Sequence, residues 1–230
     1  MSPPPPAECR IAVVTGITSA RETIRDDQNG AGAQFVAFVD RPCHSRVWRE
    51  ETACRHFSSA RRNARMHKIL VHQFVPAEYS VWLDGNVALR VPAPELVADW
   101  LQDCDLATFA HRTRRCTYEE AAACLAQRLD SPELITAQME NYRRQGLEPG
   151  AGLPETTVVV RRHTAAVCRF NNHWWSELCR YSLRDQLSFV FAARQTGLRV
   201  RLVTPTKFDH PYFHIRPRPA GAEPLPGAPA

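Results

Sequence analysis

The chain has 230 residues, 44% of them hydrophobic, and a formal net charge of +5. This length suffices for one domain with a full hydrophobic core. The charge is mild and no basic stretch alternates with aromatic residues, so nucleic-acid binding is not expected. The amino terminus lacks the profile of a signal peptide, and no run approaches the ~18 apolar residues of a membrane span. We therefore expect a soluble, cytoplasmic protein.

The composition has two unusual features. Arginine supplies almost all of the positive charge, since Lys68 and Lys207 are the only lysines. Arginine suits bidentate contacts with phosphate, so the bias is weakly in favour of anionic ligands. The eight cysteines form no Cys-x-x-Cys pair and show no zinc-ribbon spacing, which predicts reduced thiols rather than a disulfide framework.

Residues 1–8 and 216–230 are rich in Pro, Ala and Gly and are predicted to be disordered tails, which leaves residues 9–215 as a single domain. Its first half alternates apolar runs with capped helical patterns. The predicted elements are strands over 11–17 and 34–39, a helix capped by Ser58 or Ser59 and ending near 74, a strand over 80–83, a helix over 94–101 and a strand over 105–110.

The second half opens with a helical insertion over residues 117–146. Thr117 and Ser182 each begin a capping-box pattern, and Pro132 follows a serine cap at a first helical position. The predicted elements are helices over 117–129 and 132–145, a strand over 156–160, a helix over 164–181, a helix from 182 that Gly197 ends and a strand over 198–203.

Alternating strands and helices indicate an α/β fold with helical layers around a mostly parallel sheet. The insertion over residues 117–146 breaks strict alternation, so one strand can be antiparallel.

The tripeptide Asp84-Gly85-Asn86 follows the apolar strand over 80–83 directly. Ligands in open α/β sheets bind outside the carboxyl ends of strands. Two oxygen-bearing side chains one residue apart can share a hard cation such as Mg²⁺ or Mn²⁺, which could clamp a diphosphate. The alternative is an Asx turn that closes the strand, because Asp-Gly-Asn is also good turn chemistry.

Several segments together resemble one family. Asp84-Gly85-Asn86 looks like a variant of the Asp-x-Asp motif of nucleotide-sugar glycosyltransferases. The other matching blocks are 35–40 with Trp48, the basic residues of 62–68, 111–119, 152–155, 161–163, 174–175 and 182–189. Over about residues 10–200 the pattern is similar to the glycosyltransferase-like domain of plant turgor-regulation and mucilage proteins and their bacterial relatives.

The resemblance implies a GT-A-like fold, a Rossmann-type α/β/α sandwich with a mostly parallel mixed sheet. It also implies a nucleotide-sugar substrate and usually a divalent metal, here Mn or Mg. Asp84 would contact the metal and the diphosphate. Asn86 would be a neutral second ligand or a ribose contact, and its missing charge would weaken metal binding.

The basic residues Arg62, Arg65 and Lys68 lie three apart and therefore share one helix face. That face could hold the diphosphate or the donor sugar, although a solvated helix surface is the ordinary alternative. Thr15 and Asp40 fall at strand ends, where a nucleotide base would lie in this fold.

Asp185-Gln186 resembles the acidic pair that many GT-A enzymes direct at a sugar. If the reaction inverts the anomeric carbon, a carboxylate must deprotonate the acceptor hydroxyl. Asp185 is the first candidate for this base and Glu155 the second. Asp185 also stands where the capping box beginning at Ser182 would place a carboxylate.

Histidines near the carboxyl terminus supply a third metal ligand in several GT-A families. His210 is the candidate here, although Pro211 argues against a helix that would align it with His214. His111 ends a predicted strand and so faces the ligand edge. Of the adjacent Trp174 and Trp175, which point about 100° apart on a helix, one is expected in the core and the other along a groove.

The sequence thus predicts a glycosyltransferase that moves a sugar from a UDP or GDP sugar to a carbohydrate or other hydroxyl acceptor, with a divalent metal at Asp84-Gly85-Asn86. One alternative is a non-catalytic nucleotide- or carbohydrate-binding module on a decayed GT-A scaffold. Another is a hydrolase that uses the same metal and a water molecule.

Overall fold

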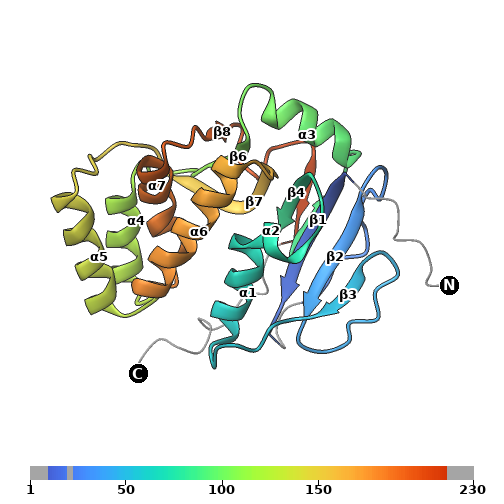
Figure 1. Ribbon diagram of the computed structural model, residues 1–230, viewed down its shortest axis with the longest axis horizontal. Coiled ribbons are helices and arrows are strands. Elements are labelled where there is room, and N and C mark those ends of the chain that lie inside the picture. The colour runs from blue at the N-terminus through green and yellow to red at the C-terminus, as the bar shows by residue number, and fades with distance from the viewer. Residues whose placement is uncertain (1–9, 20–22, 217–230) are drawn as a thin grey trace.

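A computed structural model describes residues 10–19 and 23–216 of the chain. Its centre is a seven-stranded sheet with the order β3-β2-β1-β4-β7-β6-β8 (Figure 1). The strands are β1 (Ile11–Ile17), β2 (Gln34–Val39), β3 (Arg49–Thr52), β4 (Tyr79–Leu83), β6 (Leu106–Ala110), β7 (Pro154–Arg162) and β8 (Arg201–Val203). A second, two-stranded sheet pairs β5 (Val87–Leu89) with β9 (Phe213–Ile215). Residues 1–8 and 217–230, most of the predicted tails, lie outside the described residues.

β7 is the one strand of the large sheet that runs against its neighbours. It pairs antiparallel with β4 and β6, while the remaining neighbours in the sheet pair parallel. The predicted α/β class with a mostly parallel mixed sheet is therefore confirmed. Because β7 is antiparallel, its first residues lie beside the carboxyl end of β4.

The described part of the chain has seven helices. They are α1 (Ala60–Ile69), α2 (Val71–Phe74), α3 (Ala93–Leu101), α4 (Thr117–Ala126), α5 (Pro132–Arg144), α6 (Ala165–Arg180) and α7 (Asp185–Thr196). The helices cover the sheet or, in the case of α4 and α5, lie to one side of it (Figure 1). None of these helices is both long and apolar enough to cross a bilayer.

Strand alternation divides the interior into two main cores. Val81 joins the core under α3 and the small β5–β9 sheet, whereas its neighbour Trp82 joins the core under α1, α2, α6 and α7. A third cluster forms where α4 and α5 pack beside α7. The helical insertion thus has its own apolar contacts and leaves the sheet intact.

The predicted elements agree with the structure in most places, and the differences have local causes. Ser59 is the cap of α1, and its side chain accepts a hydrogen bond from the backbone N–H of Arg62 at 3.2 Å. The helix predicted to run to residue 74 breaks into α1 and α2 at Leu70. The unpredicted strand β3 has the sequence Arg-Glu-Glu-Thr at a sheet edge, so it carries no apolar pattern.

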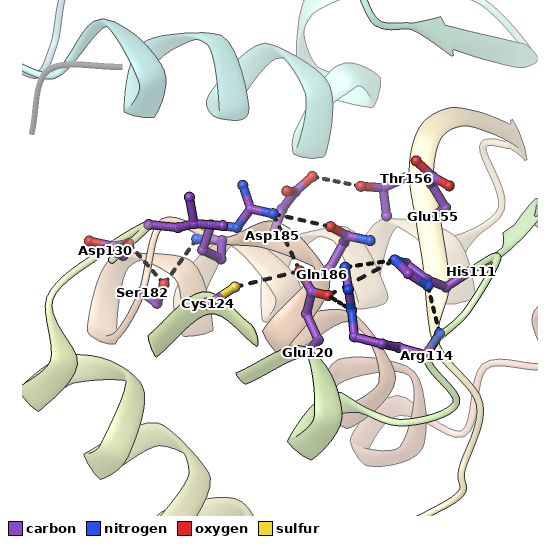
Figure 2. A network of polar contacts seen from close by, with 12 residues as sticks. His111, Arg114, Glu120, Cys124, Asp130, Glu155, Thr156, Ser182, Asp185 and Gln186 are labelled. Atoms are coloured by element: carbon purple, nitrogen blue, oxygen red, sulfur yellow. Dashed lines mark hydrogen bonds and ion pairs between the residues drawn. The ribbon is translucent and has the colours of Figure 1, made fainter. Parts of the chain in front are cut away.

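Both predicted capping boxes are wrong. α4 begins with Thr117 itself, after Cys116 at the cap, and α7 begins at Asp185 after Arg184. The hydroxyl of Ser182 instead donates a hydrogen bond to Asp130 at 2.8 Å (Figure 2). A distant carboxylate therefore competes for the serine that the local pattern assigned to the helix.

A β-bulge shapes the start of β7. Thr108 of β6 is opposite Val159, but the next residue, Phe109, is opposite Glu155. The Thr108 hydroxyl contacts the carbonyl oxygens of Glu155 and Val158 at 3.0 and 2.7 Å, which holds both ends of the bulge. Bulges often redirect side chains beside functional sites, and this one presents Thr156 and Thr157 next to the end of β4.

One buried histidine, His67, and one half-buried histidine, His163, predict how stability depends on pH. His67 stacks on Phe38 with ring centroids 4.0 Å apart, and His163 contacts the Ser80 hydroxyl at 2.8 Å. Burial lowers the pKa of each imidazole to about 4, helped by the charge of Arg161 at His163. Because an unfolded histidine has a pKa of about 6.5, the unfolded state binds more protons between these values, and stability falls as the pH falls through that window.

We expect the free energy of unfolding to fall by on the order of 3 kcal/mol for each histidine as the pH falls from about 6.5 to about 4. Urea denaturation at pH 7.5 and pH 5 measures the first part of the loss, about 2 kcal/mol per histidine. The variant His67→Gln is expected to show a smaller pH dependence than the parent protein. Equal unfolding free energies at the two pH values would contradict the assignment.

Candidate functional site

A cavity of about 450 Å³ opens where β4 ends, β7 begins and α7 starts. It brings together seven residues that the sequence predicted for the site: Arg65, Lys68, Asp84, Asn86, Glu155, Asp185 and Gln186. It adds seven that were not predicted: Thr156, Thr157, Arg184, Lys207, Phe208, Ile215 and Arg216. The location matches the rule that ligands of open α/β sheets bind at the carboxyl ends of strands.

Asp185 is the best-held carboxylate of the cavity. Lys68 Nζ lies 2.7 Å from Oδ2, and Arg65 Nε lies 3.3 Å from Oδ1. The Thr156 hydroxyl also donates to Oδ2 at 2.9 Å (Figure 2). Burial alone would raise the pKa of Asp185, but the charges of Arg65 and Lys68 outweigh it and hold the pKa well below its usual range. The carboxylate is therefore ionised, with both oxygens occupied.

Helix packing fixes the position of Asp185. It is the first residue of α7, and its backbone carbonyl accepts a hydrogen bond from the Trp174 indole at 2.9 Å. Lys68 comes from the last turn of α1 and is only 1% exposed. The Asp185–Lys68 pair therefore joins the start of α7 to the end of α1 across the cavity wall.

Asp84 stands at the cavity edge with one oxygen committed. The Trp82 indole N–H donates to Oδ1 at 2.8 Å, and Lys68 Nζ lies 3.7 Å from the same atom. The backbone N–H of Val87 returns to the Asp84 carbonyl at 2.9 Å. The tripeptide Asp84-Gly85-Asn86 thus forms a turn, and the side chains of Asp84 and Asn86 line the cavity.

The side chains near Asp84 are poorly suited to bind a divalent cation. The amide nitrogen of Asn86 donates to the Arg216 carbonyl at 3.0 Å, which ties this side chain to the carboxyl-terminal segment. In the described part of the chain, no three His, Cys, Asp or Glu side chains gather as a metal site. The predicted Mn or Mg ion at Asp84-Gly85-Asn86 stays a prediction, and the neighbouring Lys68 ammonium opposes it.

His210 does not reach this cavity. Its ring packs edge-on against Trp100 and Phe109, at centroid distances of 5.5 and 5.6 Å, and also contacts Phe213. Burial lowers its pKa. The predicted third metal ligand is therefore corrected to a residue of the aromatic cluster beneath α3, because the segment leading into β9 turns its ring inward.

Glu155 is the third carboxylate of the cavity and has other partners than Asp185. It forms an ion pair with Lys207, and its Oε1 accepts a hydrogen bond from Thr157 at 3.3 Å. Its side chain is 17% exposed, compared with 4% for Asp185. Gln186 donates to the Pro154 carbonyl at 3.0 Å, which fixes its amide beside Glu155. Glu155 is therefore the more accessible carboxylate of the two.

A second polar network supports the cavity from α4 (Figure 2). Glu120 is 1% exposed and pairs with Arg114 and with Arg184, whose Nη2 lies 3.3 Å from Oε1. His111 joins this network, since its Nδ1 accepts the backbone N–H of Arg114 at 3.0 Å. Burial and the Arg114 charge lower the His111 pKa. The network holds Arg184 at the cavity wall, and His111 itself does not line the cavity.

Three predicted donor-binding residues lie away from the cavity lining. The Arg62 guanidinium lies over the Phe57 ring at 5.3 Å from its centroid, although it shares a helix with Arg65. Thr15 is 1% exposed within β1. Asp40 pairs with Arg41 at 3.2 Å and stays partly exposed at the carboxyl end of β2, so its contact with a nucleotide base remains a prediction.

One compositional signal could have identified Lys207. The chain has 29 basic residues but only two lysines, and both lysines line the same cavity. Thr156 and Thr157 gave no such signal, because β-branched residues are ordinary in a strand. Arg184 and Arg216 belong to a large background of arginines.

Comparison with known proteins assigns most of the chain to one family model. Residues 44–209 match the model described as TOD1/MUCI70, glycosyltransferase-like domain. An Arabidopsis thaliana protein named probable hexosyltransferase MUCI70 is 31% identical over 144 residues, covering 58% of this chain and 25% of that protein. Another from the same plant, named alkaline ceramidase TOD1, is 27% identical over 152 residues, covering 61% and 33%. The chain thus spans a third or less of these relatives.

Solved glycosyltransferase structures show a general likeness. Mouse xyloside xylosyltransferase 1 aligns with a TM-score of 0.48 and 11% identity, covering 86% of this chain and 85% of that one. The galactosyltransferase LgtC aligns with a TM-score of 0.45 and 9% identity, covering 84% and 73%. A likeness at this level does not bear on activity.

Proposed function

The chain belongs to the TOD1/MUCI70 glycosyltransferase-like domain family, and we propose that it transfers a sugar from a nucleotide-sugar donor, a UDP or GDP sugar, to an acceptor hydroxyl. The supporting observation is the cavity at the end of β4. It places the carboxylates of Asp84 and Glu155 beside the side chains of Arg65, Lys207 and Gln186. Cations and carboxylates in one cleft suit the two ends of this reaction, a departing diphosphate and an attacking hydroxyl.

In this reaction the bond between the anomeric carbon and the diphosphate oxygen breaks, and its electron pair leaves on the diphosphate. The acceptor oxygen forms the new bond to the anomeric carbon and gives up its proton. The cations of the cavity stabilise the charge that grows on the diphosphate in the transition state. Asp84 has Oδ2 available for a hydroxyl of the donor, because Trp82 already holds Oδ1.

Glu155 suits the role of general base better than Asp185. Asp185 is buried, its pKa is held well below the usual range and its two oxygens engage Arg65 and Lys68. A carboxylate in that state accepts a proton poorly. We assign Asp185 the role of a positioning residue that holds the two cations. Glu155 is the general base that takes the proton of the acceptor hydroxyl if the anomeric carbon inverts.

A thermal-shift screen of nucleoside diphosphates and nucleotide sugars, with and without Mn²⁺, tests the donor. A ligand that binds only the folded state raises the melting temperature. Raised melting temperatures with one nucleotide series, followed by sugar release or transfer from its sugar conjugate, would support the proposal. No response to any nucleotide would count against it.

The variant Asp84→Ala is expected to lose at least about 100-fold in turnover, as for other residues that act in a transition state. Its unfolding free energy should fall by only about 1–2 kcal/mol, because the hydrogen bond from Trp82 and the 3.7 Å contact with Lys68 are lost. Steady-state kinetics and urea denaturation measure the two effects. Unchanged turnover in a folded variant would remove Asp84 from the site.

A hydrolase is the second candidate, because one relative carries the name alkaline ceramidase. The donor-sugar assay separates the two, since a hydrolase of that kind would release fatty acid from ceramide and leave nucleotide sugars intact. A protein that binds nucleotide but performs neither reaction would be a non-catalytic module on the same scaffold.

A further inference from the structure

The two lysines of the chain form matching arrangements on adjacent residues of β7. Lys68 Nζ donates to the Thr156 hydroxyl at 3.0 Å, and Lys207 Nζ donates to the Thr157 hydroxyl at 3.0 Å. Lys68 also pairs with Asp185, as described above, and Lys207 pairs with Glu155. The bulge in β7 makes this possible, because it lets consecutive threonines meet lysines from α1 and from the segment before β9.

The charges of the cavity wall exceed what its carboxylates can balance. Five cationic side chains line it, against the three carboxylates Asp84, Glu155 and Asp185. Arg184 is balanced by Glu120 behind the wall, and Lys68 is 1% exposed. The other cations that line the cavity are Lys207, which pairs with Glu155, Arg65, which pairs with Asp185, and Arg216. An excess of positive charge in a cleft attracts anions and opposes a divalent cation.

Asp84 is poorly placed to recruit a metal in this field. A cation on its side chain would lie near the Lys68 ammonium, which is 3.7 Å from Oδ1. A second carboxylate is missing, because residue 86 is an asparagine whose amide is tied to the Arg216 carbonyl. Compact ammonium groups and arginine forks, in contrast, bind phosphate oxygens directly.

The segment that carries Lys207 is anchored before any ligand arrives. β9 pairs with β5 directly after the Asp84-Gly85-Asn86 turn, and the Arg216 N–H bonds the Asn86 carbonyl at 2.9 Å. Arg25 ties the same two strands together through the carbonyls of Asn86 and His214 at 3.2 and 2.9 Å. The chain is thus fixed shortly after Lys207, and the contacts with Thr157 and Glu155 hold its ammonium at the cavity, which reduces the cost of ordering it on binding.

We propose that Lys207, with Arg65 and Arg216, neutralises the donor diphosphate directly, so that donor binding does not depend on a divalent metal. The inference rests on the proposed function, since it takes a nucleoside diphosphate as the ligand of this cavity. It replaces the metal expected from the Asp-x-Asp-like motif with side chains from the carboxyl-terminal segment and α1.

Calorimetric titration of UDP and GDP into the full chain, once in EDTA and once in Mn²⁺, tests this directly. The dissociation constant of the bound nucleotide is expected to agree within about twofold between the two buffers. Lys207→Gln is expected to weaken binding about tenfold or more in both, because a charge-assisted contact is lost. Lys207→Arg keeps the positive charge and should lose less nucleotide affinity. This result would show that the site is folded and that its affinity depends on the charge.

Arg199→Gln is the matched control, because it removes one positive charge from an exposed ion pair with Asp103 outside the cavity. It should leave nucleotide binding unchanged. Binding that appears only with Mn²⁺, or an unchanged Lys207→Gln variant, would overturn the metal-free site and leave glycosyl transfer standing. Absence of UDP and GDP binding in both buffers would overturn the inference together with the proposed donor.

Discussion

Replacing Asp185 with asparagine is expected to lower the unfolding free energy by about 3–5 kcal/mol and to remove most of the activity. Removing one partner of a buried ion pair leaves an uncompensated charge, and effects of this size are typical. Asp185→Asn leaves two such charges, those of Lys68 and Arg65, of which Lys68 is almost fully buried. The activity falls because Arg65 loses the carboxylate that orients it towards the cavity.

Urea denaturation of Asp185→Asn, Lys68→Met and the double variant measures the coupling. The double variant should be less destabilised than the sum of the two single variants, because the unpaired ammonium is then absent. Asp103→Asn is the surface control, since Asp103 pairs with Arg199 in an exposed position, and it should change stability by no more than about 0.5 kcal/mol. Additive effects would show that Asp185 and Lys68 do not act as a pair.

Replacing Trp174 with alanine is expected to cost about 3–5 kcal/mol, the usual range for a large aromatic residue in a core. Trp174 is 0% exposed and packs against Phe170 and Phe189 at centroid distances of 5.5 and 4.9 Å. Its indole also donates to the carbonyl of Asp185. The variant therefore opens a cavity and releases the first residue of α7, so nucleotide binding should weaken as well.

The neighbouring Trp175 provides a control of the same residue type. It is only partly buried and its ring lies 5.8 Å from that of Phe57. Trp175→Ala should cost about 1 kcal/mol and leave nucleotide affinity unchanged. Chemical denaturation and calorimetry on both variants distinguish the positions. Equal losses would mean that both rings support the core alike.

Local sequence patterns predicted the large elements because those elements have strong periodic or capping signals. The β-branched run before Arg161 predicted the core of β7, and the Ser131 cap with Pro132 predicted the start of α5, where Ser131 accepts the Leu134 N–H at 3.3 Å. The short strands β3, β5 and β9 were not predicted, because they have little pattern of their own. β5 and β9 contain three residues each and exist through their pairing with one another.

The site could be located in part from the sequence. Asp84 was found because it ends an apolar strand, a place that faces ligands in α/β folds. Asp185 was found because Asp185-Gln186 resembles the acidic pair of many GT-A enzymes. Lys207 was missed because no local pattern distinguishes its loop. Its one distinguishing feature is that it is one of only two lysines in the chain. His210 was misplaced because a histidine's role depends on whether its ring turns towards solvent or core, and here it turns into an aromatic cluster.

The order of the main elements, the α/β class and the strand end at Asp84 could be inferred from the amino-acid sequence, since they follow from short-range hydrophobic periodicity and turn chemistry. Which charged side chains come into contact depends on the folded chain. The antiparallel direction of β7 and its bulge bring Glu155 and the two threonines to β4, and the β5–β9 pairing brings Lys207 to Glu155. Such contacts join residues distant in the chain, and they form because packing and charge compensation are optimised over the whole fold.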